Sequence, residues 1–344
     1  MIEAVTEENL PEFENYIKLN PRGSYLQSSL WARQNPAWHW RGYIRRNEYK
    51  RVTGAVSFLV RDIPLLPYQI IYAGKGPVYD MGDTASLRDL LAALQEAARE
   101  EQAAIVRVDP PVEDSDKELM SVYEAYDYEK LKHRGRAPFH SRHCWILNIG
   151  KNSWARLQKT FSREQAQNLR IALRHDVEIK RGGKALAGAF GRMIEHSALR
   201  DSKKSESSEF FSGFMDTFGD RAKIYLACKD HRPIAGLLMV LTGGRYECVA
   251  RADLSDPTLH AMSLLQAAVL QTAADSGYDA VLFPVGAFYP ESELYQIFSG
   301  LGAKPDSTVG EMDWYCKPLI GMASKLILRA ADWIDREQYF LKIR

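Results

Sequence analysis

Apolar residues recur at helical spacing over residues 91–98, and a continuous apolar run follows at Ala104–Val106. The same succession returns over residues 267–274 and Ala280–Leu282, and the two stretches align without a gap. Each stretch predicts an amphipathic helix, a short polar turn and a buried strand. Because one such unit lies in each half of the chain, we predict two similar α/β domains with a ligand-binding cleft between them. A chance match of two alanine-rich helices is the alternative.

The other apolar and polar positions predict the helices and strands that complete both domains. Helices are expected after the Thr6 cap, over residues 115–133 and at the start of residues 151–181; strands are expected at Val52–Val60 paired with Tyr68–Ala73, His143–Ile149, Val177–Arg181, Ala222–Lys229, Ile234–Leu241, Tyr246–Ala250 and Glu311–Lys317. We predict a mixed α/β fold in which residues 1–145 plus 310–344 form the first domain and residues 146–309 the second. An amphipathic tail closes the chain.

Composition narrows the class of protein. The chain has 344 residues, enough for about two domains, and its 45 Lys and Arg balance 44 Asp and Glu, unlike a small nucleic-acid-binding domain. The 4 cysteines are scattered without a CxxC pair, and His140 and His143 lack further ligands, so we expect neither disulfides nor a metal site. The acidic N-terminus does not resemble a secretory signal, and no apolar run approaches the ~20 residues of a membrane span. We therefore expect a cytoplasmic protein, or one held at the cytoplasmic face of a membrane.

The order of strands and helices is typical of a GNAT acyltransferase domain. Acetyl-CoA, the usual GNAT donor, needs a glycine-rich turn whose N–H groups point at its pyrophosphate, just before a helix. At that place the second domain has residues 253–260, which contain Asp253 and Asp256 and no glycine. The first domain offers Gly82–Ser86, with Gly82 as its one glycine. We therefore expect that CoA is not the donor and predict no cofactor.

A series of motifs resembles the FemABX peptidoglycan-bridge aminoacyltransferases. The motifs are Tyr25-Leu-Gln-Ser-Ser-Leu-Trp-Ala32, Gly76-Pro-Val78, Arg107-Val-Asp-Pro-Pro-Val112, Asn168 to Ile179, and Gly286 followed by Leu294-Tyr-Gln-Ile-Phe-Ser-Gly-Leu-Gly302. The resemblance runs from about residue 20 to about residue 318 and implies two tandem GNAT-like domains. It also implies transfer of an amino acid from aminoacyl-tRNA to an amine on the stem peptide of a lipid- or UDP-linked peptidoglycan precursor. Residues 181–222 show no sustained heptads, so we expect the compact form without a coiled-coil arm.

The resemblance assigns roles to several residues. Asp109 follows a buried strand and precedes Pro-Pro, and the family places this carboxylate beside the acceptor amine, where it could orient an ammonium or accept its proton. A turn-starting Asp is the alternative. Arg200 matches an arginine that binds the precursor diphosphate, for which the planar guanidinium is suited. Lys203 and Lys204 would assist at a phosphate site, although all three cations could instead be solvated.

Two positions depart from the family pattern. Arg33 stands near a position where the family commonly has a phosphate-binding Lys, and Ser299 replaces a Lys that stabilises charge on the acyl carbonyl. A hydroxyl brings one hydrogen bond and no positive charge, and Lys304 could partly compensate. Phe298 fits a position lining the acceptor site, with a core aromatic as the alternative. We take Asp109 and Ser299 as catalytic candidates and add Tyr246 to the substrate-binding candidates.

Two segments suggest partners. Residues 151–184 have many more basic than acidic residues and could bind a tRNA backbone, or could simply be a solvated helix surface. The tail from residue 318 to 344 mixes apolar and basic residues. It could lie on an anionic membrane surface or pack onto the first domain.

The hypothesis from the sequence is an aminoacyl-tRNA-dependent N-acyltransferase that acts on a peptidoglycan precursor and works as a monomer. One alternative keeps the fold and the donor but transfers the amino acid to a small peptide or an antibiotic. The other alternative is a non-catalytic double-GNAT scaffold that binds precursor or tRNA, which the loss of the family Lys at Ser299 would favour.

Overall fold

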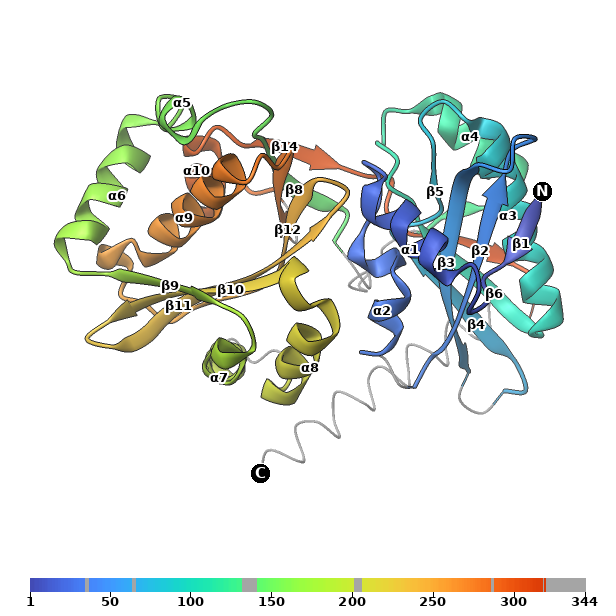
Figure 1. The fold of residues 1–344 in the computed structure, drawn as a ribbon, viewed down its shortest axis with the longest axis horizontal. Coiled ribbons are helices and arrows are strands. Elements are labelled where there is room, and N and C mark those ends of the chain that lie inside the picture. Colours follow the sequence, from blue (N-terminus) through green and yellow to red (C-terminus); the bar gives the residue numbers. More distant parts are fainter. Residues whose placement is uncertain are drawn as a thin grey trace. The chain divides into compact units, whose positions relative to one another are not determined.

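The computed structural model describes residues 1–317 except residues 35–36, 64–65, 132–140, 201–205 and 286–287, together with residue 319. The chain divides into two compact units, each built on its own sheet (Figure 1). Unit 1 holds Met1–Arg142 and the chain from Ser307 onward, and unit 2 holds His143–Asp306. Both boundaries fall slightly before the positions predicted from the sequence. The amphipathic tail predicted from residue 318 lies outside the described residues apart from Leu319, which is exposed.

Unit 1 is a mixed sheet covered on both faces by helices. Its strands follow the order β1-β2-β3-β4-β6-β15-β7, with β5 paired to β3. Their bounds are β1 Ile2–Ala4, β2 His39–Arg46, β3 Val52–Asp62, β4 Gln69–Gly74, β5 Val78–Tyr79, β6 Ala103–Asp109, β7 Glu129–Lys130 and β15 Met312–Tyr315. The helices are α1 Leu10–Leu19, η1 Tyr25–Gln27, α2 Ser29–Ala32, α3 Thr84–Glu100 and α4 Lys117–Ala125.

Alternation along β3 separates two hydrophobic clusters in unit 1. Val56 and Phe58 point into the cluster that contains the apolar face of α3, whereas Ala55 packs with Phe13 of α1. Successive side chains of a strand face opposite sides of the sheet, so β3, whose residues 53–60 are all buried, serves both layers.

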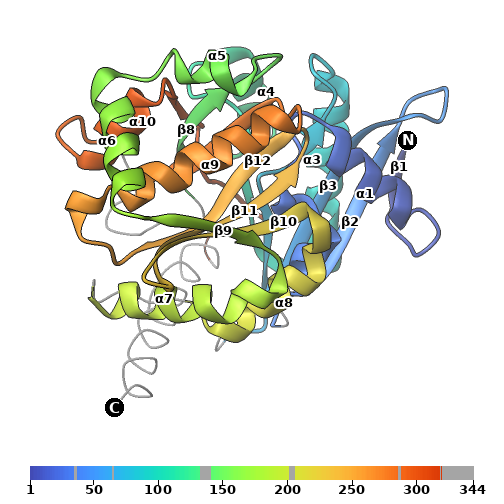
Figure 2. The same cartoon turned by 60° about the vertical axis from the view of Figure 1, so that its left-hand side comes forward.

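Unit 2 repeats the layered arrangement with strands in the order β14-β8-β13-β12-β11-β10-β9. Their bounds are β8 His143–Asn148, β9 Glu178–Gly182, β10 Ala222–Lys229, β11 Arg232–Thr242, β12 Arg245–Asp253, β13 Ala280–Val285 and β14 Lys304–Ser307. The helices are α5 Trp154–Gln158, α6 Arg163–Arg174, η2 Lys184–Leu186, α7 Ala187–Arg200, α8 Ser208–Phe218, η3 Gly219–Arg221, η4 Pro257–Leu259, α9 Ala261–Asp275 and α10 Glu293–Gly300. In Figure 2, α5, α6 and α9 lie above the sheet, and α7 and α8 lie below it.

The internal repeat is a structural unit in both halves of the chain. Helix α3 links β4 to β6, which pair in parallel, and α9 links β12 to β13, which also pair in parallel. A parallel pair needs a crossover connection, and the repeated helix supplies it in each sheet. The helix–strand succession predicted from the apolar pattern is therefore confirmed in both units.

Two local predictions were wrong. The first helix begins at Leu10 rather than directly after Thr6, because the Asn9 carboxamide accepts the Thr6 N–H across an intervening turn. Within the region 115–133, helix α4 ends at Ala125 and a strand, β7, follows at Glu129–Lys130 and pairs with β15. A partner strand from the far end of the sequence thus overrides the helical pattern.

Between β9 and β10, where an arm could be inserted, the described residues form η2, α7, α8 and η3. Helix α7 approaches strand β11 at Gly236. A Cβ at this position would lie 2.8 Å from the ring of Phe190 on α7. Helices α7 and α8 thus pack closely on the sheet, which agrees with the compact form expected from the sequence.

Candidate active site

Asp109 is the last residue of β6, and its side chain is completely buried in unit 1. Its register partner on the parallel strand β4 is Gly74, and the next residue, Lys75, places its ammonium Nζ 2.8 Å from Asp109 Oδ2. The same ammonium donates a hydrogen bond to the Ser141 carbonyl at 3.0 Å. A buried carboxylate is tolerated when an opposite charge accompanies it, and Lys75 supplies that charge.

Lys75 was not predicted as a site residue. It lies between two glycines in the turn after β4 and has a φ of 53°, a left-handed conformation that is uncommon for residues other than glycine. The sequence feature that could have indicated Lys75 is its place in a glycine-rich turn after a buried strand. Only the register of β4 and β6 shows that Lys75 meets Asp109.

A second group of buried charges is formed by Arg107, on the same strand as Asp109, and by two acids at the start of the neighbouring strand β15. Arg107 donates two hydrogen bonds to Asp313 of β15, at 2.7 and 3.0 Å, and its Nη1 lies 3.6 Å from the Glu311 carboxylate. All three side chains are almost fully buried. Burial alone would lower the pKa of Arg107, but the hydrogen bonds and charge of Asp313 outweigh that effect and raise it.

The charges also act on Tyr72 of β4. Burial raises the pKa of the Tyr72 phenol well above its usual value, and the negative charges of Asp109 and Glu311 add to that rise. Tyr72 therefore keeps its proton at neutral pH. Unit 1 thus holds Asp109 next to a set of buried charged side chains that pair with one another. Of these residues, the sequence predicted only Asp109 as part of the site.

Two predicted substrate-binding residues of unit 2 lie in its core. Phe298 is fully buried and stacks on Trp145, with ring centroids 5.7 Å apart. The Tyr246 hydroxyl is also buried and donates a hydrogen bond to the Tyr225 hydroxyl at 3.2 Å. The contacts of Phe298 are therefore those of a core aromatic residue, which was the alternative interpretation of this position.

Ser299 and Lys304 lie at the surface of unit 2. Ser299 is on the last turn of α10, and its hydroxyl donates to the Gln296 carbonyl at 3.4 Å. Lys304 is exposed at the first residue of β14. Within the described part of the chain, this long, local hydrogen bond is the one that the Ser299 hydroxyl forms, and the residue is exposed to solvent.

A pocket of about 400 Å³ lies next to α10 and was not predicted. Trp145, Phe288 and Tyr295 form its aromatic walls, and Arg251 of β12 contributes a guanidinium. The Nη1 atom of Arg251 is buried and has no hydrogen-bond partner among the residues that the structure describes. An arginine that reaches a pocket with an unsatisfied donor is suited to an acceptor atom of a ligand, such as a carbonyl, carboxylate or phosphate oxygen.

The other predicted cations occupy the ends of helices. Arg200 is the exposed last residue of α7, and Arg33 is exposed directly after α2. Lys204 lies outside the described residues, as does Lys203. Arg33 belongs to unit 1 and Arg200 to unit 2, and the phosphate-binding role predicted for each stays a prediction.

The loop before α9 is already occupied by its own side chains. Asp253 accepts the Ser255 N–H at 3.0 Å, and Asp256 accepts the Thr258 N–H at 2.9 Å. In a CoA-dependent GNAT domain, N–H groups at this place point at the pyrophosphate. Here two carboxylates take such groups and add negative charge, so the loop repels a pyrophosphate. Among the described residues, no cluster of three metal-ligating side chains is found either.

A model of the FemAB family matches residues 6–235 of the chain. The chain belongs to the FemAB family. Lipid II:glycine glycyltransferase of Staphylococcus saprophyticus subsp. saprophyticus is 27% identical over 232 residues, covering 64% of this chain and 54% of that relative. The protein of the same name from Staphylococcus aureus is also 27% identical over 232 residues and is covered to 53%. This FemAB chain thus spans about half the length of the curated relatives it matches.

Solved structures support the fold of this FemAB chain. The crystal structure of FemX superposes with a TM-score of 0.81 at 17% identity, covering 94% of this chain and 100% of FemX. A tandem GNAT protein from the clavulanic acid biosynthesis pathway superposes with a TM-score of 0.56 at 13% identity, covering 92% of this chain and 98% of that protein. The predicted fold class, two tandem GNAT-like domains of mixed α/β structure, is confirmed.

Proposed function

We propose that this protein is an aminoacyl-tRNA-dependent N-acyltransferase that adds an amino acid to the stem-peptide amine of a peptidoglycan precursor. The observation that carries the proposal is the match to relatives named lipid II:glycine glycyltransferase, which covers 64% of this chain, beside the FemAB family match over residues 6–235. The acceptor is a lipid- or UDP-linked precursor. The reaction takes place in the cytoplasm or at the cytoplasmic face of the membrane, although no helix in the described part of the chain has the length and hydropathy to cross a bilayer.

The chemistry is a direct acyl transfer. The stem-peptide ammonium loses a proton, its nitrogen attacks the ester carbonyl, an amide bond forms, and the ester bond to the tRNA 3′ oxygen breaks as that oxygen gains a proton. Asp109 is suited to orient the ammonium and accept its proton, because a carboxylate within hydrogen-bond reach can do both. Lys75 holds one oxygen of that carboxylate, Oδ2, with its ammonium 2.8 Å away.

The aminoacyl-tRNA donor is supported by the loop before α9. Because Asp253 and Asp256 occupy its N–H groups, a CoA donor would have no pyrophosphate site there. An ester of tRNA needs no such site.

The test is to incubate the purified protein with a pool of charged tRNAs and a UDP-linked or, in a parallel reaction, a lipid-linked precursor, then to measure the precursor mass. An increase equal to one amino-acid residue, absent when the tRNAs are deacylated, would support the proposal. No increase with any charged tRNA, for either UDP- or lipid-linked precursor, would favour the second candidate function, a non-catalytic double-GNAT scaffold that binds precursor or tRNA. That second candidate is motivated by Ser299, which stands where the family pattern has a lysine.

We expect Ser299→Lys to raise the turnover number by about tenfold or more, which corresponds to about 1.4 kcal/mol of transition-state stabilisation. The ester carbonyl gains negative charge as the amine attacks, so a cation there stabilises the transition state more than the bound substrate. The measurement is steady-state kcat and KM for aminoacyl-tRNA. Ser299→Met is the matched control, since it adds length without charge. A fall in turnover with Lys would mean that the wild-type hydroxyl, or Lys304 nearby in sequence, already serves the carbonyl.

We expect Arg200→Ala to raise KM for the precursor with little change in KM for aminoacyl-tRNA, because the proposed role of Arg200 is to bind the precursor diphosphate. Arg200→Lys should restore only part of the affinity, since lysine cannot form the two parallel hydrogen bonds of a guanidinium. Acceptor kinetics that do not change in the alanine variant would show that Arg200 is a surface residue without this role.

A further inference from the structure

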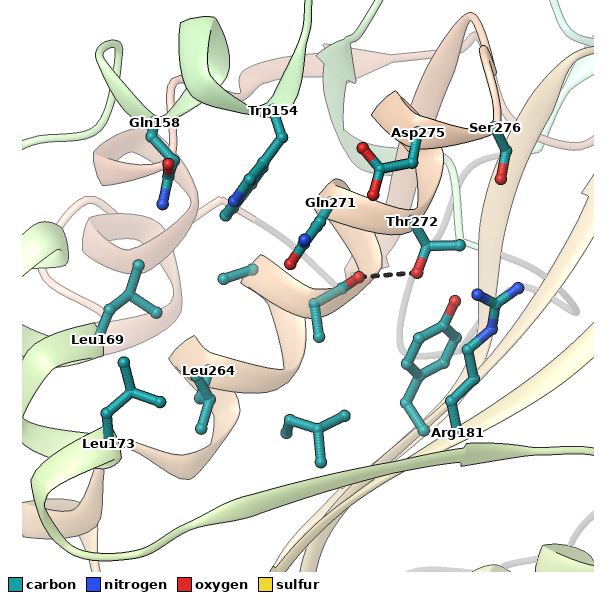
Figure 3. A pocket seen from close by; sticks show the side chains of 14 residues that line it. Trp154, Gln158, Leu169, Leu173, Arg181, Leu264, Gln271, Thr272, Asp275 and Ser276 are labelled. Carbon is teal, nitrogen blue, oxygen red and sulfur yellow. Dashed lines mark hydrogen bonds between the residues drawn. The ribbon is translucent and has the colours of Figure 1, made fainter.

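Unit 2 has a second pocket, on the face of its sheet covered by α5, α6 and α9, with a volume of about 570 Å³. We call it the α6–α9 pocket. Its volume falls in the range of about 300–1,000 Å³ that is typical of small-ligand sites. No residue assigned to the proposed reaction lines it. Figure 3 shows side chains from helices α5, α6 and α9 and from strand β9 pointing into one space.

One part of the α6–α9 pocket is apolar and contains an aromatic ring. Leu169 and Leu173 lie one helical turn apart on α6, and Leu264 faces them from α9 (Figure 3). The half-buried indole of Trp154 lies above them, supported edge-on by Phe161 at a centroid distance of 5.7 Å. A flat ring held over an apolar floor provides a surface on which a planar group can stack.

The other part of the pocket is polar and available to a ligand. Gln158 and Gln271 are exposed, and neither carboxamide has a hydrogen-bond partner within the described part of the chain. Arg181 of β9 stands over the Tyr225 ring at 5.7 Å, which holds its guanidinium at the pocket. Asp275 is the acidic residue of the lining and can accept a hydrogen bond from a hydroxyl or an amino group.

Exposed cations lie on α5 and α6, two of the helices that line the pocket, and on the turn between them. They belong to the basic segment noted in the sequence and are Arg156, Lys159, Arg163, Arg170 and Arg174. Among the residues that the structure describes, none of these side chains, nor Arg181, forms an ion pair with a carboxylate. Lys184, from the same segment, is by contrast paired with Asp216 at 2.6 Å. A group of cations without carboxylate partners attracts a polyanion, because binding releases the counterions of the polyanion.

We propose that the α6–α9 pocket binds an unpaired base of a single-stranded RNA end, with Trp154 stacking on the base and Arg181 contacting its phosphate. Stacking on an aromatic ring next to a basic surface is the usual way in which proteins bind single-stranded nucleic acid. Gln158 and Gln271 can hydrogen-bond the base edge, and Asp275 can accept from a ribose hydroxyl. The site itself follows from unit 2 alone; the further step, that this RNA is the donor tRNA, rests on the proposed function.

The test uses fluorescence anisotropy of a labelled single-stranded RNA of about eight nucleotides, a length within the usual site size. Trp154→Ala should raise Kd by about tenfold or more, and Trp154→Tyr should retain most of the affinity. Arg181→Ala should weaken binding and reduce the slope of log K against log salt by about 0.7, the value expected for one phosphate contact. Tyr49→Ala and Arg88→Ala, which remove exposed side chains of unit 1, should change neither value.

A second measurement does not depend on any variant folding. RNA that carries 4-thiouridine is crosslinked to the wild-type protein by light, and the labelled peptide is identified by mass spectrometry. A crosslink within residues 154–181 supports the proposal. A crosslink confined to unit 1, or a Kd for the folded Trp154→Ala protein equal to that of the wild type, would overturn it.

The outcome for the pocket is separable from the outcome for the enzyme. RNA that binds and crosslinks at Trp154, without any transfer to a precursor, would refute the proposed function and leave the RNA site standing. Normal transfer by Trp154→Ala, with unchanged KM for aminoacyl-tRNA and unchanged RNA affinity, would refute the RNA site and leave the transferase standing.

Discussion

Asp109→Asn should lower the turnover number for aminoacyl transfer by about 10²- to 10⁴-fold, the usual contribution of a positioned proton acceptor. The carboxamide keeps the size of the side chain but can neither compensate the ammonium of the acceptor nor take its proton. It also leaves the partly buried Lys75 ammonium without its charge partner. The measurement is kcat, together with the melting temperature to show that the variant is folded.

Lys75→Met separates the positioning role of Lys75 from the proton-accepting role of Asp109. If Lys75 only positions Asp109, the methionine variant should lose turnover but retain a pH-dependent rate that reports a carboxylate, whereas Asp109→Asn should lose that dependence. Lys75→Arg should recover part of the rate, because a guanidinium can still reach a carboxylate oxygen. A folded Asp109→Asn variant with wild-type turnover would contradict the assignment of Asp109 as proton acceptor.

Arg107→Met should lower the free energy of unfolding by about 3–5 kcal/mol, the typical cost of removing one partner from a buried ion pair. The substitution leaves Asp313 and Glu311 with uncompensated negative charge inside unit 1. The measurement is urea unfolding followed by circular dichroism, with the change read from the midpoint at constant slope.

Two further variants control the Arg107 experiment. Arg99→Met removes a surface cation paired with Glu96, both side chains being more than half exposed, and should cost no more than about 1 kcal/mol. Arg107→Met combined with Asp313→Leu and Glu311→Gln removes the buried charges together and should recover much of the loss. A cost for Arg107→Met as small as that for Arg99→Met would mean that the buried charges are not coupled.

The sequence by itself determined the secondary structure and class of this protein. The apolar spacing over residues 91–106 and 267–282 predicted a helix followed by a buried strand in each half, and α3–β6 and α9–β13 are those elements. Such periodicity is a local property, because a helix or strand must turn its own apolar face toward the core. The motif order identified the family, and the acidic loop at residues 253–260 already argued against CoA.

Only the tertiary structure decided which side chains meet. Lys75 reaches Asp109 through the register of β4 and β6, and Arg107 reaches Asp313 across 206 positions of sequence. Local patterns carry no information about such partners, because strand pairing is chosen by the packing of the whole sheet. The same limit explains why Phe298, which the motif assigned to the acceptor site, is found stacked in the core, and why Trp154 and Arg181 first appear as neighbours of one pocket once α5 and β9 are folded around α9.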